Sequence, residues 1–128
     1  MSDTQQQFED VGRSLSAAVK CSLQHVCGGT PRTRELAEQL SLDKSTINRL
    51  IRTAEATDPL SALHASPSRQ GFELFERSLT EAEVPARAIE DLRNSTDRFD
   101  RLLTSLPHGR ASLDVMLSAW LPESRAAS

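Results

Sequence analysis

The chain has 128 residues, of which 38% are hydrophobic and only 4% aromatic. This length suits one domain, or a small module with an extension, whose core consists mainly of Leu, Ile, Val and Ala. The formal net charge of −3 excludes a protein that coats nucleic acid through charge alone. No apolar run approaches the ~20 residues of a membrane span, and the polar first ten residues are no signal peptide, so we expect a cytoplasmic protein.

The first 30 residues predict one long amphipathic helix. Gly28 and Gly29 follow it as stop signals, because glycine accepts the left-handed conformation that often ends a helix. Thr30 and Pro31 then predict the start of a second helix, with Thr30 as N-cap and Pro31 at the first helical position. The apolar residues of the first helix recur at steps of three and four: Phe8, Val11, Leu15, Val19, Leu23 and Val26.

The second half of the chain also has helical period. Residues 57–70 hold two prolines and several small polar side chains, so we expect a loop there, with room for a helical turn at Leu60–Leu63. No segment alternates as a strand, and the fold class is therefore predicted to be all-α. Three further helices are predicted, around Phe72–Leu79, over 85–106 and over 113–121, followed by a disordered tail at 122–128.

The last two predicted helices carry long apolar stripes. Their apolar face exceeds what a 128-residue monomer needs, and small DNA readers usually dimerise, so the stripes are predicted to form a homodimer interface. The same spacing is typical of a helix packed inside a bundle, and both interpretations stay open. The predicted interface residues are Ile89, Leu92, Phe99, Leu103, Leu113, Leu117 and Trp120.

Residues 33–52 meet the packing demands of two short helices that cross steeply. Ala37 is small where the two backbones approach. Ser41 stands in the turn where glycine is common, because the position favours a positive φ, and we therefore expect a different turn geometry. Asp43 is predicted to cap the second helix, over 43–56. The apolar residues that would lock the helices together are Leu36, Leu40, Leu42, Ile47 and Leu50.

The helix over 43–56 is predicted to present a polar and basic face outward. Lys and Arg reach guanine acceptors or phosphates, Asn pairs with adenine through two hydrogen bonds, and hydroxyls bind phosphate or bases. Residues 29–56 carry a net charge of +1, whereas residues 57–128 carry −3. We therefore predict a helix-turn-helix that reads double-stranded DNA, with 43–56 as the major-groove recognition helix. The predicted DNA-binding residues are Arg34, Lys44, Ser45, Thr46, Asn48, Arg49 and Arg52.

This stretch resembles the winged helix-turn-helix of IclR-type bacterial transcription regulators over residues 12–56. The matching residues are Leu42, Lys44, Ser45, Thr46, Arg49, Leu50 and Ile51. The resemblance implies that Arg52 and Arg34 lie nearer the DNA backbone and that five residues face the major groove: Lys44, Ser45, Thr46, Asn48 and Arg49. Two departures are a missing β-hairpin wing after residue 56 and no room for the large effector domain of the family. Either residues 57–70 replace the wing with a loop carrying His64, Ser66, Ser68 and Arg69, or the chain is a fragment of a longer protein.

These observations predict a DNA-binding transcription regulator. Two rival hypotheses stay open. One is a helical adaptor that binds a protein partner through its acidic C-terminal helices and does not bind DNA, and the other is a regulator that responds to a small molecule, although nothing identifies the effector. The predicted organisation is a helix-turn-helix unit over 1–56, a loop in place of a wing over 57–70, a helical and dimerising extension over 71–121 and the tail over 122–128.

The sequence offers little to catalysis, metals or redox chemistry. The three histidines lack Cys or carboxylate neighbours at ligand spacing, so we predict no metal site. No nucleophile turn or phosphate-binding loop is present, and we predict no enzyme and no cofactor. Cys21 and Cys27 lie six apart on the first predicted helix. At about 100° per residue they face different directions, so we expect two buried small side chains and no disulfide between them.

Overall fold

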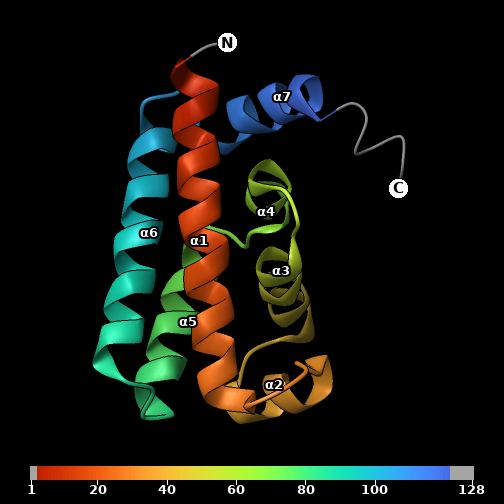
Figure 1. The fold of residues 1–128 in the computed structure, drawn as a ribbon, viewed down its shortest axis with the longest axis vertical. Coiled ribbons are helices and arrows are strands. Elements are labelled where there is room, and N and C mark those ends of the chain that lie inside the picture. Colours follow the sequence, from red (N-terminus) through yellow and green to blue (C-terminus); the bar gives the residue numbers. More distant parts are fainter. Residues whose placement is uncertain (1–2, 122–128) are drawn as a thin grey trace.

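The computed structural model describes residues 3–121, which form helices joined by short connections (Figure 1). The predicted all-α fold class is confirmed, while the predicted disordered tail lies outside the described residues. In chain order the helices are α1 (Asp3–Cys27), α2 (Thr33–Leu40), α3 (Lys44–Glu55), α4 (Pro59–Ala65), α5 (Arg69–Glu81), α6 (Ala86–Thr104) and α7 (Arg110–Trp120). None of the described helices is long and apolar enough to cross a membrane.

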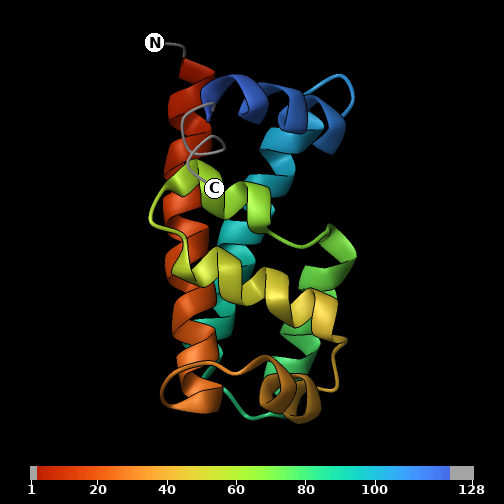
Figure 2. The same cartoon turned by 90° about the vertical axis from the view of Figure 1, so that its right-hand side faces the viewer.

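The long helix α1 is the central helix of the fold. Its apolar residues at three- and four-residue steps form one continuous buried stripe, which packs against α3, α4 and α6. α6 runs beside α1 along the long axis, and α3 and α4 cross the other side (Figures 1 and 2). The helix ends as predicted at Gly28, where φ is +66° and the amide donates to the Gln24 carbonyl at 2.8 Å.

The second helix begins later than predicted. α2 starts at Thr33. The preceding residue, Arg32, has an extended backbone (φ −120°, ψ 124°), and its side chain makes no capping hydrogen bond. The first turn closes when the Leu36 amide donates to the Arg32 carbonyl at 3.0 Å. Thr30 and Pro31 therefore belong to the connection from α1, and the prediction that they begin the helix is wrong by two positions.

Residues 57–70 do not form the predicted loop, because α4 occupies half of that stretch. Asp58 caps the helix by accepting from the Leu60 amide at 3.4 Å, and Pro59 stands in the first turn, where its missing N–H costs nothing. Leu60 and Leu63 are buried, and α4 packs between α1 and α3. The helical turn predicted at Leu60–Leu63 is confirmed within α4, and the loop prediction is wrong for the rest of Pro59–Ala65, because Pro59 starts a helix here and does not break one.

The predicted dimer residues are mostly part of the chain's own core. Leu103 and Trp120 are half-buried, and the Trp120 ring lies 6.2 Å from the Phe8 ring, centroid to centroid. Buried side chains from α1 to the end of α7 form one hydrophobic cluster. The apolar stripes thus pack within one chain, as in a bundle, and do not give a reason for dimerisation. The five buried members are Ile89, Leu92, Phe99, Leu113 and Leu117.

Candidate nucleic-acid interface

A tight turn over residues 41–43 joins α2 to α3. Ser41 adopts the left-handed conformation (φ 54°, ψ 42°), and its amide bonds to the Ala37 carbonyl. The Leu42 amide donates to the same carbonyl at 3.1 Å. The expectation of a different turn geometry is wrong, because Ser41 takes the positive φ that glycine would take more cheaply.

The apolar contacts across the turn follow the sequence pattern. Two half-buried residues, Ala37 and Leu42, pack against the core beside the turn. The helices lie at a steep angle to one another (Figures 1 and 2). Because this packing buries one side of α3, its opposite side is turned outward. The remaining locking residues, at most 2% exposed, are Leu36, Leu40, Ile47 and Leu50.

Asp43 fixes the start of α3. Its carboxylate accepts from the Thr46 amide at 3.0 Å and from the Thr46 hydroxyl at 2.7 Å, so the predicted N-cap is confirmed. The Thr46 hydroxyl and amide bonds lower the pKa of the Asp43 carboxyl below its ordinary value. The half-buried Thr46 is therefore occupied in capping, and the structure does not bring it to the exposed face with the other predicted DNA-binding residues.

The exposed face of α3 is free of acidic partners. Between residues 3 and 121, no ion pair involves Lys44, Arg49 or Arg52. In Figure 2 α3 crosses the face turned to the viewer, and no other described helix covers it. The predicted DNA-binding residues that are exposed are Lys44, Ser45, Asn48, Arg49 and Arg52 on α3, with Arg34 on α2.

Asn48 is held in place by a neighbour that the sequence analysis did not single out. The Thr33 hydroxyl of α2 donates to Asn48 Oδ1 at 2.7 Å. This bond distinguishes the amide oxygen from the amide nitrogen and leaves the nitrogen with both of its donors. The oxygen keeps a second lone pair, so the side chain retains the donor and acceptor that an adenine edge requires.

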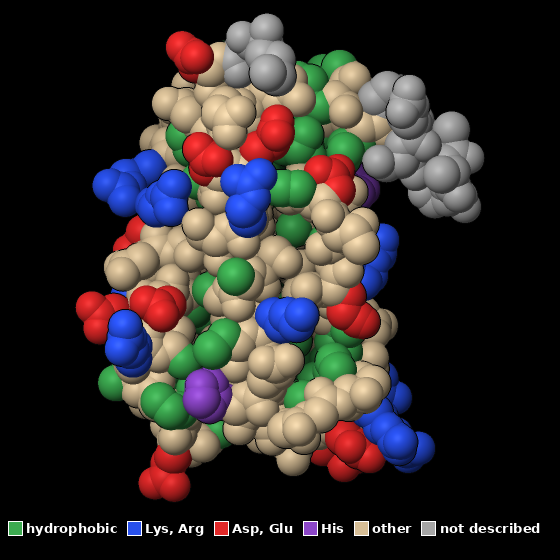
Figure 3. Space-filling model, viewed as in Figure 1, with side chains coloured by type: hydrophobic (Ala, Val, Ile, Leu, Met, Phe, Trp, Pro, Cys, Tyr) green, Lys and Arg blue, Asp and Glu red, His purple; other side chains and the backbone are tan. Residues whose placement is uncertain are grey.

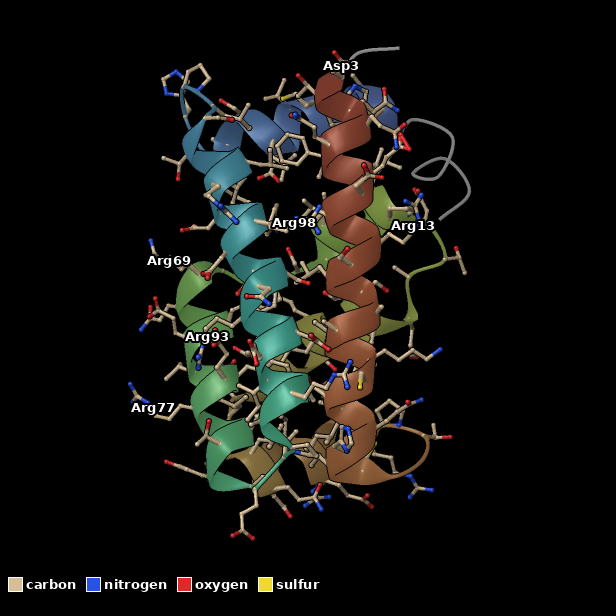
Figure 4. The ribbon with its side chains drawn as sticks, turned by 60° about the vertical axis from the view of Figure 1, so that its left-hand side comes forward. Asp3, Arg13, Arg69, Arg77, Arg93 and Arg98 are labelled. Atoms are coloured by element: carbon tan, nitrogen blue, oxygen red, sulfur yellow. The ribbon has the colours of Figure 1, made fainter. Side chains whose placement is uncertain are left out.

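The opposite side of the molecule has a different charge pattern. On the face formed by α1 and α6, acidic and basic side chains are interspersed (Figure 3). Two ion pairs join α5 to α6: Arg93 Nε lies 2.8 Å from Glu76 Oε1, and Arg69 Nη1 lies 3.2 Å from Asp100 Oδ2. Figure 4 shows Arg69 and Arg93 on this side, on α5 and α6. Three arginines of α6 also lack an ion pair among the described residues, but α6 carries four acidic residues as well, whereas Glu55 is the one acidic residue of α3.

A groove of about 660 Å³ runs beside α3. One wall is α3 itself, including Arg49 and Arg52. The other walls are the end of α4, the connection over 64–69, and the first residues of α7. The sequence analysis missed Arg110 in this groove, because 58 positions separate Arg110 from Arg52 and no local pattern links them. Only folding brings the two together.

Arg110 is anchored to the end of α4. Its Nη2 donates to the Leu63 carbonyl at 3.1 Å and to the Ser66 carbonyl at 3.0 Å, and the Leu63 carbonyl also accepts from the Ser66 amide and hydroxyl. Burial lowers the pKa of the Arg110 guanidinium, and the charge of Arg49 lowers it further, while Asp114 opposes both. The two guanidinium groups are thus held close enough to repel.

Both cysteines are free thiols, and neither is buried. Cys21 is exposed and Cys27 is half-buried, with its Sγ 3.3 Å from the Gly29 carbonyl oxygen. The expectation that both are buried small side chains is wrong. Among residues 3–121, no three His, Cys, Asp or Glu side chains are grouped so that they could hold a metal ion.

No protein-family model, curated protein or solved structure matches the chain. The similarity of residues 12–56 to IclR-type regulators stays a prediction.

Proposed function

We propose that the protein binds double-stranded DNA and regulates transcription, with α3 as the recognition helix in the major groove. The observation that carries this proposal is the α2–turn–α3 unit, in which α3 presents an exposed face whose basic side chains have no ion pair within the described residues. Lys44, Arg49 and Arg52 lie on that face, and three unpaired cations on one helix of an acidic chain suit a polyanionic partner.

The side chains divide into two roles. Asn48 and Arg49 lie near the middle of α3, where the helix would approach base edges, and their amide and guanidinium groups suit adenine and guanine. Arg34 on α2 is exposed to one side of α3 and is suited to a phosphate. Base contacts give sequence preference and phosphate contacts give affinity for every sequence.

The test is selection from a randomised duplex library, followed by fluorescence anisotropy on selected and random duplexes at several salt concentrations. The wild type should bind selected duplexes with a steep salt dependence. Arg49→Ala should cost about 1–3 kcal/mol on the selected duplex and relax its base preference, whereas Arg34→Ala should weaken selected and random duplexes alike.

A matched control removes the same charge elsewhere. The double variant Lys44→Ala/Arg49→Ala should lose both affinity and preference. Arg77→Ala/Arg87→Ala changes the net charge equally at exposed positions on α5 and α6, and should leave the preference intact. Equal losses in the two double variants, or no binding of any duplex at low salt, would refute the proposal and turn attention to a protein partner.

A further inference from the structure

The groove beside α3 concentrates positive charge from three helices. Arg49 and Arg52 come from α3, Arg69 from the first turn of α5, and Arg110 from the first turn of α7. Asp114 is the one acidic residue among those that line it, and its Oδ1 lies 3.8 Å from Arg110 Nε. Arg69 is shared with Glu73 and Asp100, and Asp114 offsets Arg110, so the excess charge belongs mainly to α3.

The fold brings Arg49 and Arg110 to the same groove. Arg110 is fixed by its bonds to the end of α4, and Arg49 is close enough to lower its pKa. Two like charges that packing keeps together are stabilised by an anion placed between them. Within the described residues neither Arg49 nor Arg52 has a carboxylate partner, so an anion that bridges them would belong to another molecule.

The helix ends add to the same field. The first turns of α3, α5 and α7 contribute residues to the groove and lie along one edge of the molecule (Figure 2). The N-terminal end of a helix carries a partial positive charge, and the ends of α5 and α7 add theirs to that of the arginines, whereas the Asp43 carboxylate offsets that of α3. Hydroxyl groups of Ser45 and Ser68 also line the groove and are suited to phosphate oxygens.

We propose that the groove between α3, the connection over 64–69 and α7 is a phosphate-binding site centred on Arg49, Arg52 and Arg110. The phosphate is either a backbone phosphate of duplex DNA or part of a free phosphorylated ligand, which would compete with DNA for Arg49 and Arg52. The assignment to a DNA phosphate rests on the proposed function, whereas the anion-binding site itself does not.

The experiment titrates the full chain with pyrophosphate at constant ionic strength and follows amide and arginine Nε–H signals by NMR. We expect shifts confined to the groove. Arg52→Gln and Arg110→Gln should weaken pyrophosphate binding about tenfold, because each removes a charge-assisted hydrogen bond. Arg77→Gln is the matched control, because Arg77 projects from α5 away from the groove (Figure 4) and should bind pyrophosphate as the wild type does.

A second experiment distinguishes a DNA phosphate from a free phosphorylated ligand. If the groove receives a DNA phosphate, Arg69→Gln and Arg110→Gln should each lower the salt slope of duplex binding by about one. If it receives a free ligand, those slopes stay unchanged and pyrophosphate displaces the duplex. Pyrophosphate shifts spread over the surface, or an Arg77→Gln effect equal to that of Arg52→Gln, would overturn the site. Because Arg52→Gln alters an exposed side chain, it stays informative if Arg110→Gln unfolds the protein. Failure to bind any duplex, with pyrophosphate binding intact, would overturn the proposed function alone.

Discussion

Gly12 marks the point where α1 and α4 approach most closely. A Cβ built on Gly12 would lie 2.8 Å from the Pro59 carbonyl carbon and closer still to its carbonyl oxygen. Non-bonded carbon atoms prefer separations of about 3.5–4.0 Å. Gly12→Ala therefore requires α4 to move away from α1 by about 0.7 Å or more. The obstacle is backbone beside a proline ring, so no side-chain rotation relieves the contact.

The size of the effect follows from what lies around this contact. A gap of 0.5–1 Å forfeits about a quarter to a half of the dispersion attraction, and the buried Leu60 and Leu63 of α4 would lose it together. Overpacking usually costs about 1–3 kcal/mol, and a backbone obstacle belongs at or above the upper end. Alanine regains about 1 kcal/mol of helix propensity. The net loss in the free energy of unfolding should be about 2–3 kcal/mol.

Urea unfolding followed by circular dichroism at 222 nm measures this loss. With a typical denaturant slope, the midpoint should fall by about 1–2 M. Ala17→Gly is the control for helix propensity, because Ala17 is an exposed position of the same helix, and it should lose about 1 kcal/mol. A Gly12→Ala protein as stable as the wild type would refute the close approach of α1 and α4.

Three other substitutions test single features. Ser41→Gly should raise the free energy of unfolding by about 0.5–1 kcal/mol in urea titrations, because glycine removes the cost of the left-handed conformation; a loss would contradict the turn geometry. Ser22→Ala should raise it by about 1 kcal/mol, because the buried Ser22 hydroxyl has no hydrogen-bond partner in the described part of the chain; a large loss would indicate a hidden partner. Asp43→Asn should destabilise the protein at neutral pH, because the capping bonds lower the pKa of Asp43 and so favour its charged form in the folded state. That contribution is present above the ordinary pKa of 3.8 and is lost as the pH falls through the lower folded pKa. The urea midpoints of wild type and variant should therefore converge on acidification, and a constant difference from pH 7 to 2 would contradict the assignment.

The helices that the sequence predicts well are those that carry their own signals. α1 combines a long run of apolar residues at helical spacing with two glycines at its end, and Asp43 is a recognisable N-cap for α3. α4 lacks such a period because it is only seven residues long and is buried on most sides. A short buried helix has no polar face to alternate with an apolar one, so periodicity cannot reveal it, and Pro59 was more easily interpreted as the end of a helix than as its start.

The candidate site also combines features that are local in the sequence with features that depend on the fold. The exposed set on α3 follows from the helical repeat, which is a local property. The groove depends on Arg110, whose position is set by the carbonyls of α4, a helix that periodicity did not reveal. The predicted dimer residues show what periodicity alone cannot decide. Periodicity identifies an apolar stripe, but whether the stripe packs against its own chain or against a second copy depends on the whole topology.

The contact at Gly12 also connects stability with the proposed sites. α3 packs against α4 but is also held directly to α1, since the Ser16 hydroxyl donates to the Ala54 carbonyl at 3.4 Å and the two helices pack together. A displaced α4 would therefore leave the outer face of α3 in place and move the carbonyls that anchor Arg110. Under conditions where Gly12→Ala remains folded, we expect the base preference of the wild type with weakened pyrophosphate binding. Loss of base preference with unchanged pyrophosphate binding would show that α4 positions the recognition helix and leaves the groove unaffected.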